Sequence, residues 1–177
     1  ADSSSMPPVP PEQCVVMISF NDATAGADAE KICNYLNQRG IATFCTRSYC
    51  SQVHGDWRKA TVTGANVCVA YIALITDGWQ RSDECQFETA IIKNRMVKHA
   101  VAVIPVWYKS FDKNFDIESK QFYNNLWMSL QSCFRERQNW LEDLYTLVKQ
   151  AATVALDASV QPQAAALTAG GGGGHGG

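Results

Sequence analysis

Three stretches of this sequence are almost continuously apolar, and segments with helical character separate them. The stretches are Cys14–Phe20, Val67–Ile75 and Ala100–Trp107. A strand that lacks polar alternation has both of its faces covered, and such strands are typical of parallel sheets packed between helices. The sequence therefore predicts buried parallel strands at the centre of the fold, with Val67–Ile75, the most apolar run, as a central strand.

Amphipathic segments alternate with these strands along the chain. The predicted helices are Ala27–Arg39, Asp56–Gly64, a segment from Ser82 to about Lys98, and Gln138–Ala152, and a short strand is predicted at Ile41–Cys45. Loops are predicted at Thr46–Gly55 and Lys109–Lys120, and Gln121–Phe134 is predicted to hold a helix, with a short fifth strand left open. This order predicts an α/β class, doubly wound sheet of four to five parallel strands with helices on both faces.

The length of 177 residues fits one domain with tails. Residues 1–13 are rich in Ser and Pro and are predicted to be a disordered leader, residues 14–152 the folded domain, and residues 153–177 an Ala/Gly-rich disordered tail. The hydrophobic share of 46% is ample for a core.

Composition also limits the partners and the compartment. The net charge is −2 and no basic stripe exists, so nucleic acid is not an expected partner. No run of about 18 apolar residues is present and the first residues have no secretory character, so no membrane partner is expected. Seven cysteines, an odd number, some of them inside apolar runs, favour a reducing, cytoplasmic location.

Ligands of doubly wound sheets bind outside the carboxyl ends of the strands. The corresponding ends here are Phe20-Asn21-Asp22, Cys45-Thr46-Arg47, Ile75-Thr76 and Trp107-Tyr108. The helix that begins near Ser82 leaves this same edge. A binding crevice is therefore expected beside the first turns of that helix.

Glu88 is the candidate for chemistry in this crevice. Ser82 is a plausible N-cap of its helix, and at helical spacing Glu88 falls in a narrow gap between two apolar arcs, in line with Glu84 and Arg95. Dehydration, and the like charge of Glu84 one turn back, would both raise the pKa of Glu88. The alternative is a half-exposed glutamate on an ordinary helix.

Several motifs, taken in order, resemble those of a TIR domain. Ile18-Ser19-Phe20 is similar to the first box of that family, and His54-Gly55-Asp56-Trp57 is similar to the end of its BB loop. Thr76 to Trp79, Ser82 and then Cys85-x-x-Glu88 resemble its strand, turn and Cys-x-x-Glu helix, and Ile104-Pro105-Val106-Trp107-Tyr108 resembles its fourth strand and third box. The resemblance covers roughly Cys14–Gln150 and implies a flavodoxin-like fold. Two departures are Glu84, where the family commonly has Trp, and His54, where the BB loop usually has Pro.

The resemblance implies one of two functions. One kind of TIR domain cleaves NAD+ to nicotinamide and ADP-ribose or a cyclic variant in immune or stress signalling, and in that kind Glu88 would be the catalytic residue. The other kind is a non-enzymatic interaction module that acts as a signalling adaptor by homotypic assembly. Partners implied are NAD+ and other TIR domains, with a homo-oligomer as the active form.

Four more residues are candidates for binding NAD+ in the cleft. Phe20 would stack on a base or on nicotinamide, Arg47 would meet a pyrophosphate, and Trp57 and Trp79 would wall the crevice. The structural alternatives stay open: core packing for Phe20 and Trp57, and a solvated loop position for Arg47. Cys85 is expected to pack and to have no nucleophilic role.

No cofactor and no metal are expected. No Gly-x-Gly-x-x-Gly follows the first strand, so NAD+ would be a substrate and not a resident cofactor. Cys45, Cys50 and His54 fit no strong zinc spacing. A phospho-receiver domain shares the sheet topology, but here no convincing Lys completes its set of acidic residues.

Overall fold

The apolar runs form the three inner strands of one parallel sheet. The structure, a computed structural model, describes residues 7–53, 56–98, 100–108 and 133–153, and for residues 50–53 only the backbone. The inner strands are β1 (Val16–Ser19), β3 (Ala70–Ile75) and β4 (Ala102–Trp107), and the edge strands are β2 (Thr43–Phe44) and β5 (Cys133–Phe134). The order is β2-β1-β3-β4-β5, with every pair parallel. This is the flavodoxin-like order, so the predicted fold class is confirmed, including the fifth strand.

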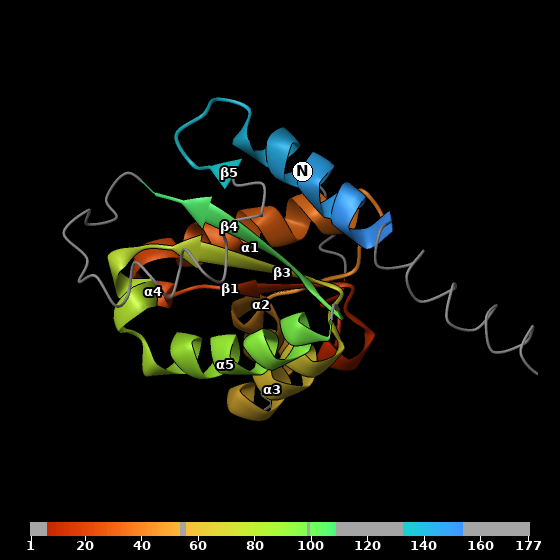
Figure 1. Ribbon diagram of the computed structural model, residues 1–177, viewed down its shortest axis with the longest axis vertical. Coiled ribbons are helices and arrows are strands. Elements are labelled where there is room, and N and C mark those ends of the chain that lie inside the picture. The colour runs from red at the N-terminus through yellow and green to blue at the C-terminus, as the bar shows by residue number, and fades with distance from the viewer. Residues whose placement is uncertain (1–6, 54–55, 99, 109–132, 154–177) are drawn as a thin grey trace, which may run out of the picture.

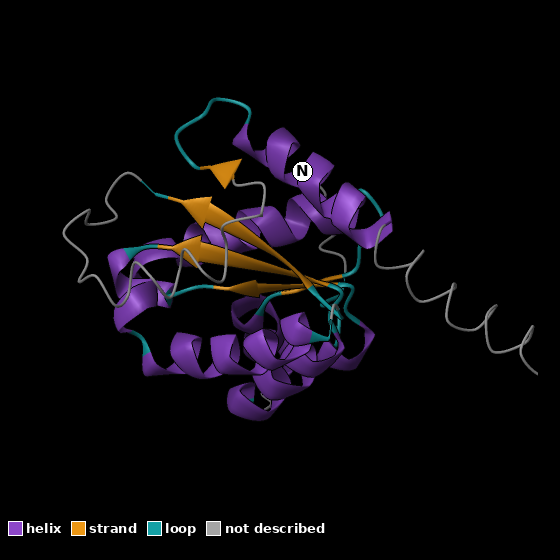
Figure 2. Cartoon of the chain, in the orientation of Figure 1, coloured by secondary structure: helices purple, strands orange, loops and turns teal. Residues whose placement is uncertain are grey.

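Helices cover both faces of the sheet, which explains the lack of polar alternation (Figures 1 and 2). The helices are α1 (Asp22–Gln38), α2 (Thr46–Val53), α3 (Trp57–Val67), α4 (Asp77–Arg81), α5 (Asp83–Val97) and a C-terminal helix over residues 140–153. In β1, Val16 and Ile18 pack on the side of α1 and the C-terminal helix, while Met17 packs on the side of α3 and α5. Both sides of each inner strand are therefore core.

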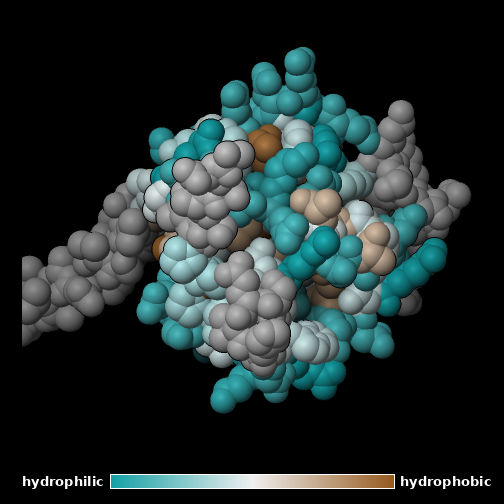
Figure 3. Space-filling model, turned by 180° about the vertical axis from the view of Figure 1, so that it is seen from behind, coloured by the Kyte–Doolittle hydropathy of each residue, from teal (hydrophilic) through white to brown (hydrophobic). Residues whose placement is uncertain are grey.

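The molecular surface seen from behind is largely hydrophilic, with apolar colour in small separate patches (Figure 3). No helix in the described parts of the chain is both long and apolar enough to pass through a bilayer.

Two of the predicted helix starts depend on side-chain caps. Ser82 Oγ accepts a hydrogen bond from the amide of Cys85 at 3.3 Å, at the start of α5. The Asp56 carboxylate accepts from the amides of Arg58 and Lys59 at 3.0 and 3.3 Å, at the start of α3. Each cap satisfies amides that the first helical turn leaves without a partner, and both predicted caps are confirmed.

The predicted loop at Thr46–Gly55 is wrong for residues 46–53, which form α2. Thr, Ser and Cys in this segment have low helix propensity, which favours the loop prediction. Tyr49 nevertheless donates its amide to the Cys45 carbonyl at 3.0 Å and packs against the core, edge-on to Phe44 with 5.6 Å between ring centres. The helix thus gains stability from packing that its propensity does not supply.

The packed domain begins before Cys14. Pro11–Gln13 form a 3-10 helix, Pro11 is buried, and Val9 packs against the core on the α3 side. Part of the segment expected to be a disordered leader is thus packed against the domain through apolar contacts. Its Pro-rich composition alone does not indicate these contacts. The predictions for Lys109–Lys120, for most of Gln121–Phe134 and for residues 154–177 lie outside the described residues.

A buried carboxylate joins α1 to the ends of β4 and β5. Asp28 Oδ2 accepts from the Tyr108 hydroxyl at 2.6 Å and from Arg135 Nε at 2.9 Å, and its Oδ1 accepts from Arg135 Nη2 at 3.2 Å. The Asp28 side chain is only 17% exposed. Burial alone would raise the pKa of Asp28, but the hydrogen bonds from Arg135 and Tyr108 outweigh it and hold that pKa below its ordinary value.

We expect Asp28→Asn to lower the free energy of unfolding at pH 7 by about 2 kcal/mol, because it leaves Arg135 without its anionic partner. A carboxyl with a lowered pKa stabilises the fold above the ordinary Asp pKa and loses that effect as the pH falls. The difference from wild type should therefore shrink below about pH 4. Urea denaturation at pH 7 and pH 3.5 measures it, with the exposed Glu142→Gln as control. A difference that does not depend on pH would contradict the ionic role of Asp28.

Candidate functional site

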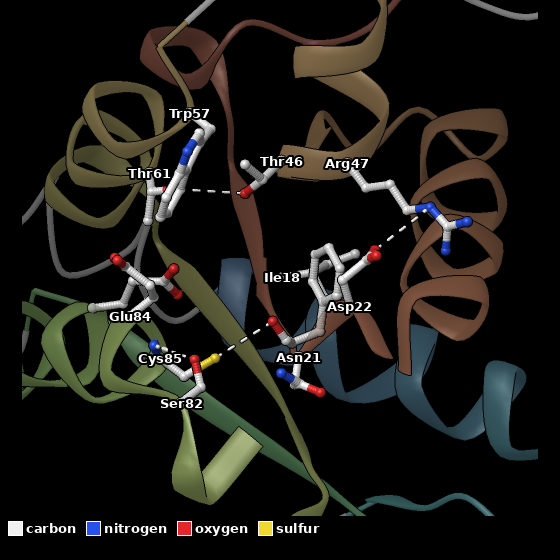
Figure 4. A pocket seen from close by; sticks show the side chains of 12 residues that line it. Ile18, Asn21, Asp22, Thr46, Arg47, Trp57, Thr61, Ser82, Glu84 and Cys85 are labelled. Carbon is white, nitrogen blue, oxygen red and sulfur yellow. Dashed lines mark hydrogen bonds and ion pairs between the residues drawn. The ribbon is translucent and has the colours of Figure 1, made fainter. Parts of the chain in front are cut away.

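A cavity of about 430 Å³ opens at the carboxyl edge of the sheet, between the two helical layers. It is lined by residues from β1, from the starts of α1 and α2, and from α3 and α5: Ile18, Phe20, Asn21, Asp22, Thr46, Arg47, Trp57, Thr61, Ser82, Glu84, Cys85 and Glu88. In Figure 4, Trp57 and Glu84 lie on one side of the opening, and Asp22 and Arg47 lie on the other. The fold argument from strand ends thus leads to the observed position of the cavity.

Glu88 is buried, with 8% of its surface exposed, and lies on the cavity wall. The alternative of a half-exposed glutamate is therefore wrong. Burial raises the pKa of Glu88 from its ordinary 4.5 to about 7, hydrogen bonds from Ser19 and Tyr71 oppose the rise, and the charge of Glu84 adds a smaller increase. The Tyr71 hydroxyl donates to Glu88 Oε2 at 3.4 Å.

Glu84 is paired across the rim of the cavity. Its Oε1 lies 2.7 Å from Arg58 Nη2, which joins α5 to α3. The two side chains are 38% and 66% exposed, so water screens the pair and it adds little stability. Dehydration is the largest effect on the pKa of Glu88, and the charge of Glu84 adds to it.

The structure brings Phe20, Arg47 and Trp57 together with Glu88 around one cavity. Phe20 is half-buried at the end of β1, and its carbonyl accepts a hydrogen bond from the Cys85 thiol at 3.4 Å. Trp57, 43% exposed, is the first residue of α3.

Arg47 stands at the start of α2 beside two carboxylates. Its Nε lies 3.6 Å from Asp22 Oδ1 and 3.7 Å from Glu30 Oε1, and its side chain is 42% exposed. It is therefore half-solvated, as the loop interpretation expected, although its backbone is helical and it also lines the cavity.

Trp79 differs from the other candidates because it does not line the cavity. It is fully buried within α4, whose N-cap Thr76 accepts from the Trp79 amide at 3.1 Å. Its indole N–H donates to Ser19 Oγ at 2.9 Å. Burial of the indole requires a partner for this N–H. The prediction that Trp79 lies in the cleft therefore differs from the structure, where it is a core residue.

Sequence reasoning missed the hydroxyls that face Glu88, which come from Ser19 and Tyr71. Both are buried in inner strands, with exposures of 1% and 0%. A signal was available, because Ser19 is a polar residue in an otherwise apolar run, and a buried hydroxyl needs a partner.

The described residues contain no group of three or more His, Cys, Asp or Glu side chains able to hold a metal ion. Cys45 is buried in the core on the α1 side. The side chain of Cys50 and the whole of His54 lie outside the described residues.

Comparison with known protein families gives a match over most of this domain. The family model described as "TIR domain" matches residues 16–141. The chain belongs to the TIR domain family. TIR domains are signalling domains, and the matched range contains all five strands and the cavity.

A solved structure with a similar fold is that of a metazoan TIR-STING receptor from C. gigas in complex with 2',3'-cGAMP. It is 14% identical in sequence with a TM-score of 0.54, and the match covers 78% of this chain and 40% of that one. The chain therefore spans less than half of that receptor, and at this identity the likeness concerns the fold alone. A search of curated proteins finds no match.

Two of the TIR motifs contribute residues to the cavity wall. The first-box residues Ile18 and Phe20 and both named residues of Cys85-x-x-Glu88 line it. The residue that departs from the family pattern, Glu84, lies at the rim, while the BB-loop residues His54 and Gly55 lie outside the described residues.

We expect Glu88→Gln to make this TIR domain more stable than wild type at pH 8 and equally stable at pH 4. A carboxyl whose pKa is raised by folding loses its contribution to stability as the pH rises, here between about 4.5 and above 7. The gap should reach about 2–3 kcal/mol at pH 8. Urea denaturation at both pH values tests it, with Glu142→Gln as control. A wild type as stable as Glu88→Gln at pH 8 would refute the burial of an ionised carboxylate.

Proposed function

We propose that this TIR domain is an NAD+ glycohydrolase, which cleaves NAD+ to nicotinamide and ADP-ribose or a cyclic variant, with Glu88 as the catalytic residue. The observation that carries the proposal is the buried Glu88 carboxyl on the wall of a cavity at the carboxyl edge of the sheet. The cavity volume of about 430 Å³ falls within the usual range for small-molecule sites. NAD+ acts here as substrate, and the proposed setting is immune or stress signalling.

The chemistry needs a single carboxylate. Nicotinamide leaves NAD+ as a neutral molecule, so no general acid has to protonate it, in contrast to ordinary glycosides. The ribose becomes positive and oxocarbenium-like, and an anion beside it in a site with little water stabilises this charge. Glu88 also has an oxygen available to the ribose hydroxyls. Water, or the adenine in the cyclising case, then attacks the ribose carbon.

The remaining cavity residues suit the other parts of NAD+. Phe20 and Trp57 offer aromatic faces to nicotinamide or adenine, and rings of this kind bind a π-system by stacking. Arg47 provides a guanidinium to the pyrophosphate, with the fork geometry that favours phosphate oxygens. Asp22 and Glu30 lie 3.6 and 3.7 Å from Arg47 Nε, and a pyrophosphate bound there would replace these exposed ion pairs.

Glu88 must be ionised to act as an anion, and its pKa of about 7 has a consequence. Near neutral pH only about half of the molecules carry the active form. Activity should accordingly rise with pH on an acid limb centred near 7. Activity and stability therefore depend on pH in opposite directions, because the free energy of unfolding falls as Glu88 ionises.

The test is nicotinamide release from NAD+ by wild type, Glu88→Gln and the exposed control Glu142→Gln, from pH 5.5 to 8.5. We expect Glu88→Gln to lose at least about a hundredfold in kcat, as removal of one charge-stabilising group does in other enzymes. The control should match wild type, whose kcat should rise through pH 7. Equal release by wild type and Glu88→Gln would remove Glu88 from the mechanism.

A second candidate function, homotypic assembly as a signalling adaptor, is favoured by a different observation. Large apolar side chains are exposed on α5, with Phe87 at 53% and Val97 at 78%. Phe87 lies next to the Arg58–Glu84 pair, with which it lines a smaller hollow. An exposed aromatic beside charged groups is the kind of feature found at protein interfaces. Assembly and catalysis are compatible if the active form is a homo-oligomer.

We expect Phe87→Glu to weaken self-association, because it places a charge on the apolar contact. Sedimentation velocity over a range of concentrations measures the effect, with the exposed Glu142→Gln as control. If the oligomer is also the active form, the concentration dependence of nicotinamide release should shift with it. Unchanged sedimentation would exclude this face of α5 from the assembly.

A further inference from the structure

The carboxyl of Glu88 faces two hydroxyls from neighbouring strands of the sheet. Tyr71, on β3, donates to Glu88 Oε2 at 3.4 Å. The Ser19 hydroxyl, on β1, lowers the pKa of the same carboxyl by hydrogen bonding. Exposure is 1% for Ser19 and 0% for Tyr71. The two strands are paired in register, Met17 with Tyr71 and Ser19 with Ala73. Both hydroxyls are therefore carried by paired inner strands, whereas the carboxyl that they face is carried by a helix.

A third residue determines which way the Ser19 hydroxyl points. The Trp79 indole N–H, which has no acceptor capacity, donates to Ser19 Oγ at 2.9 Å. One lone pair of Ser19 is thereby occupied, and its own proton is left to donate elsewhere. The Tyr71 phenol remains protonated because burial raises its pKa well above the ordinary value. Both hydroxyls are thus donors, and an ionised carboxylate is purely an acceptor.

We propose that Ser19 and Tyr71 are positioning residues of this site, whose two hydroxyls hold the ionised Glu88 carboxylate in one orientation on the cavity wall, with Trp79 directing the Ser19 hydroxyl. The inference rests on the proposed function of Glu88. It explains how a carboxyl that is shielded from water can still ionise near neutral pH. Each hydrogen bond that a hydroxyl donates to the carboxylate favours the ionised form of Glu88 over its neutral form. Without the two donors, burial would keep Glu88 protonated at neutral pH.

Other titratable groups around Glu88 come from each element that surrounds the cavity. On α5 these are Glu84 and Cys85, with Arg58 of α3 paired to Glu84. Across the cavity they are Asp22 of α1 and Arg47 of α2, which lie 3.6 Å from one another. The variants below leave all of these groups in place, so a change in the titration of Glu88 reports on the hydroxyls.

The experiment is a carbon-13 NMR titration of the Glu88 carboxyl in the full chain, assigned with Glu88→Gln. It compares wild type with Ser19→Ala, Tyr71→Phe and Trp79→Phe. We expect Ser19→Ala and Tyr71→Phe each to raise the pKa of Glu88 by about one unit, and Trp79→Phe to raise it less. Two control variants each remove a hydroxyl elsewhere in the domain and should leave it unchanged: Thr43→Val at edge strand β2 and Tyr49→Phe on α2.

Kinetics provide the second readout. With NAD+, the acid limb of kcat should move to higher pH by the same amount in Ser19→Ala and Tyr71→Phe, with about a fivefold loss near pH 7 and little change in KM. If wild type releases no nicotinamide, the proposed function fails, but the titration still decides the role of the hydroxyls. If Ser19→Ala does not fold, Tyr71→Phe decides it.

An unmoved Glu88 pKa in both folded variants overturns the proposal. A shift in only one of them removes the other residue from the positioning role.

Discussion

The inner strands of this TIR domain are buried on both faces, and this constraint decides where polar chemistry can occur. A parallel sheet that is covered by helices has no solvent-exposed face, so a ligand can reach it only at the ends of the strands. At the carboxyl edge, the loops leaving β1 and β3 part toward opposite helical layers. The cavity lined by Phe20, Trp57 and Glu88 lies at this edge.

The same constraint accounts for the state of Glu88. A carboxyl on the wall of a cavity at this edge is largely shielded from water, which makes its ionisation unfavourable. The pKa of Glu88 is raised to about 7, because hydrogen bonds from Ser19 and Tyr71 oppose the effect of burial. Both residues belong to inner strands of the sheet and not to loops.

The sequence predicted the fold well because its strongest signals were apolar runs and caps. These signals involve residues that are close together in the chain, such as the apolar strands and the caps Ser82 and Asp56. A single sequence is enough to recognise them. The sequence did not predict α2, because the low helix propensity of its residues hides the packing of Tyr49 against the core. It counted Trp79 among the cleft residues, but the direction in which a side chain turns near a strand end cannot be read from the sequence. The supporting role of Ser19 depends on which atoms the fold brings near it, although its polarity inside an apolar run was visible.

The Asp28 carboxylate has a consequence for how this domain comes apart. One acid on α1 binds both Tyr108, just after β4, and Arg135, just after β5. The strand β5 has two residues and lies at the edge of the sheet, where it pairs with β4. Loss of this acid would therefore release the β5 edge first, while the inner strands β1 and β3 keep their neighbours on both sides.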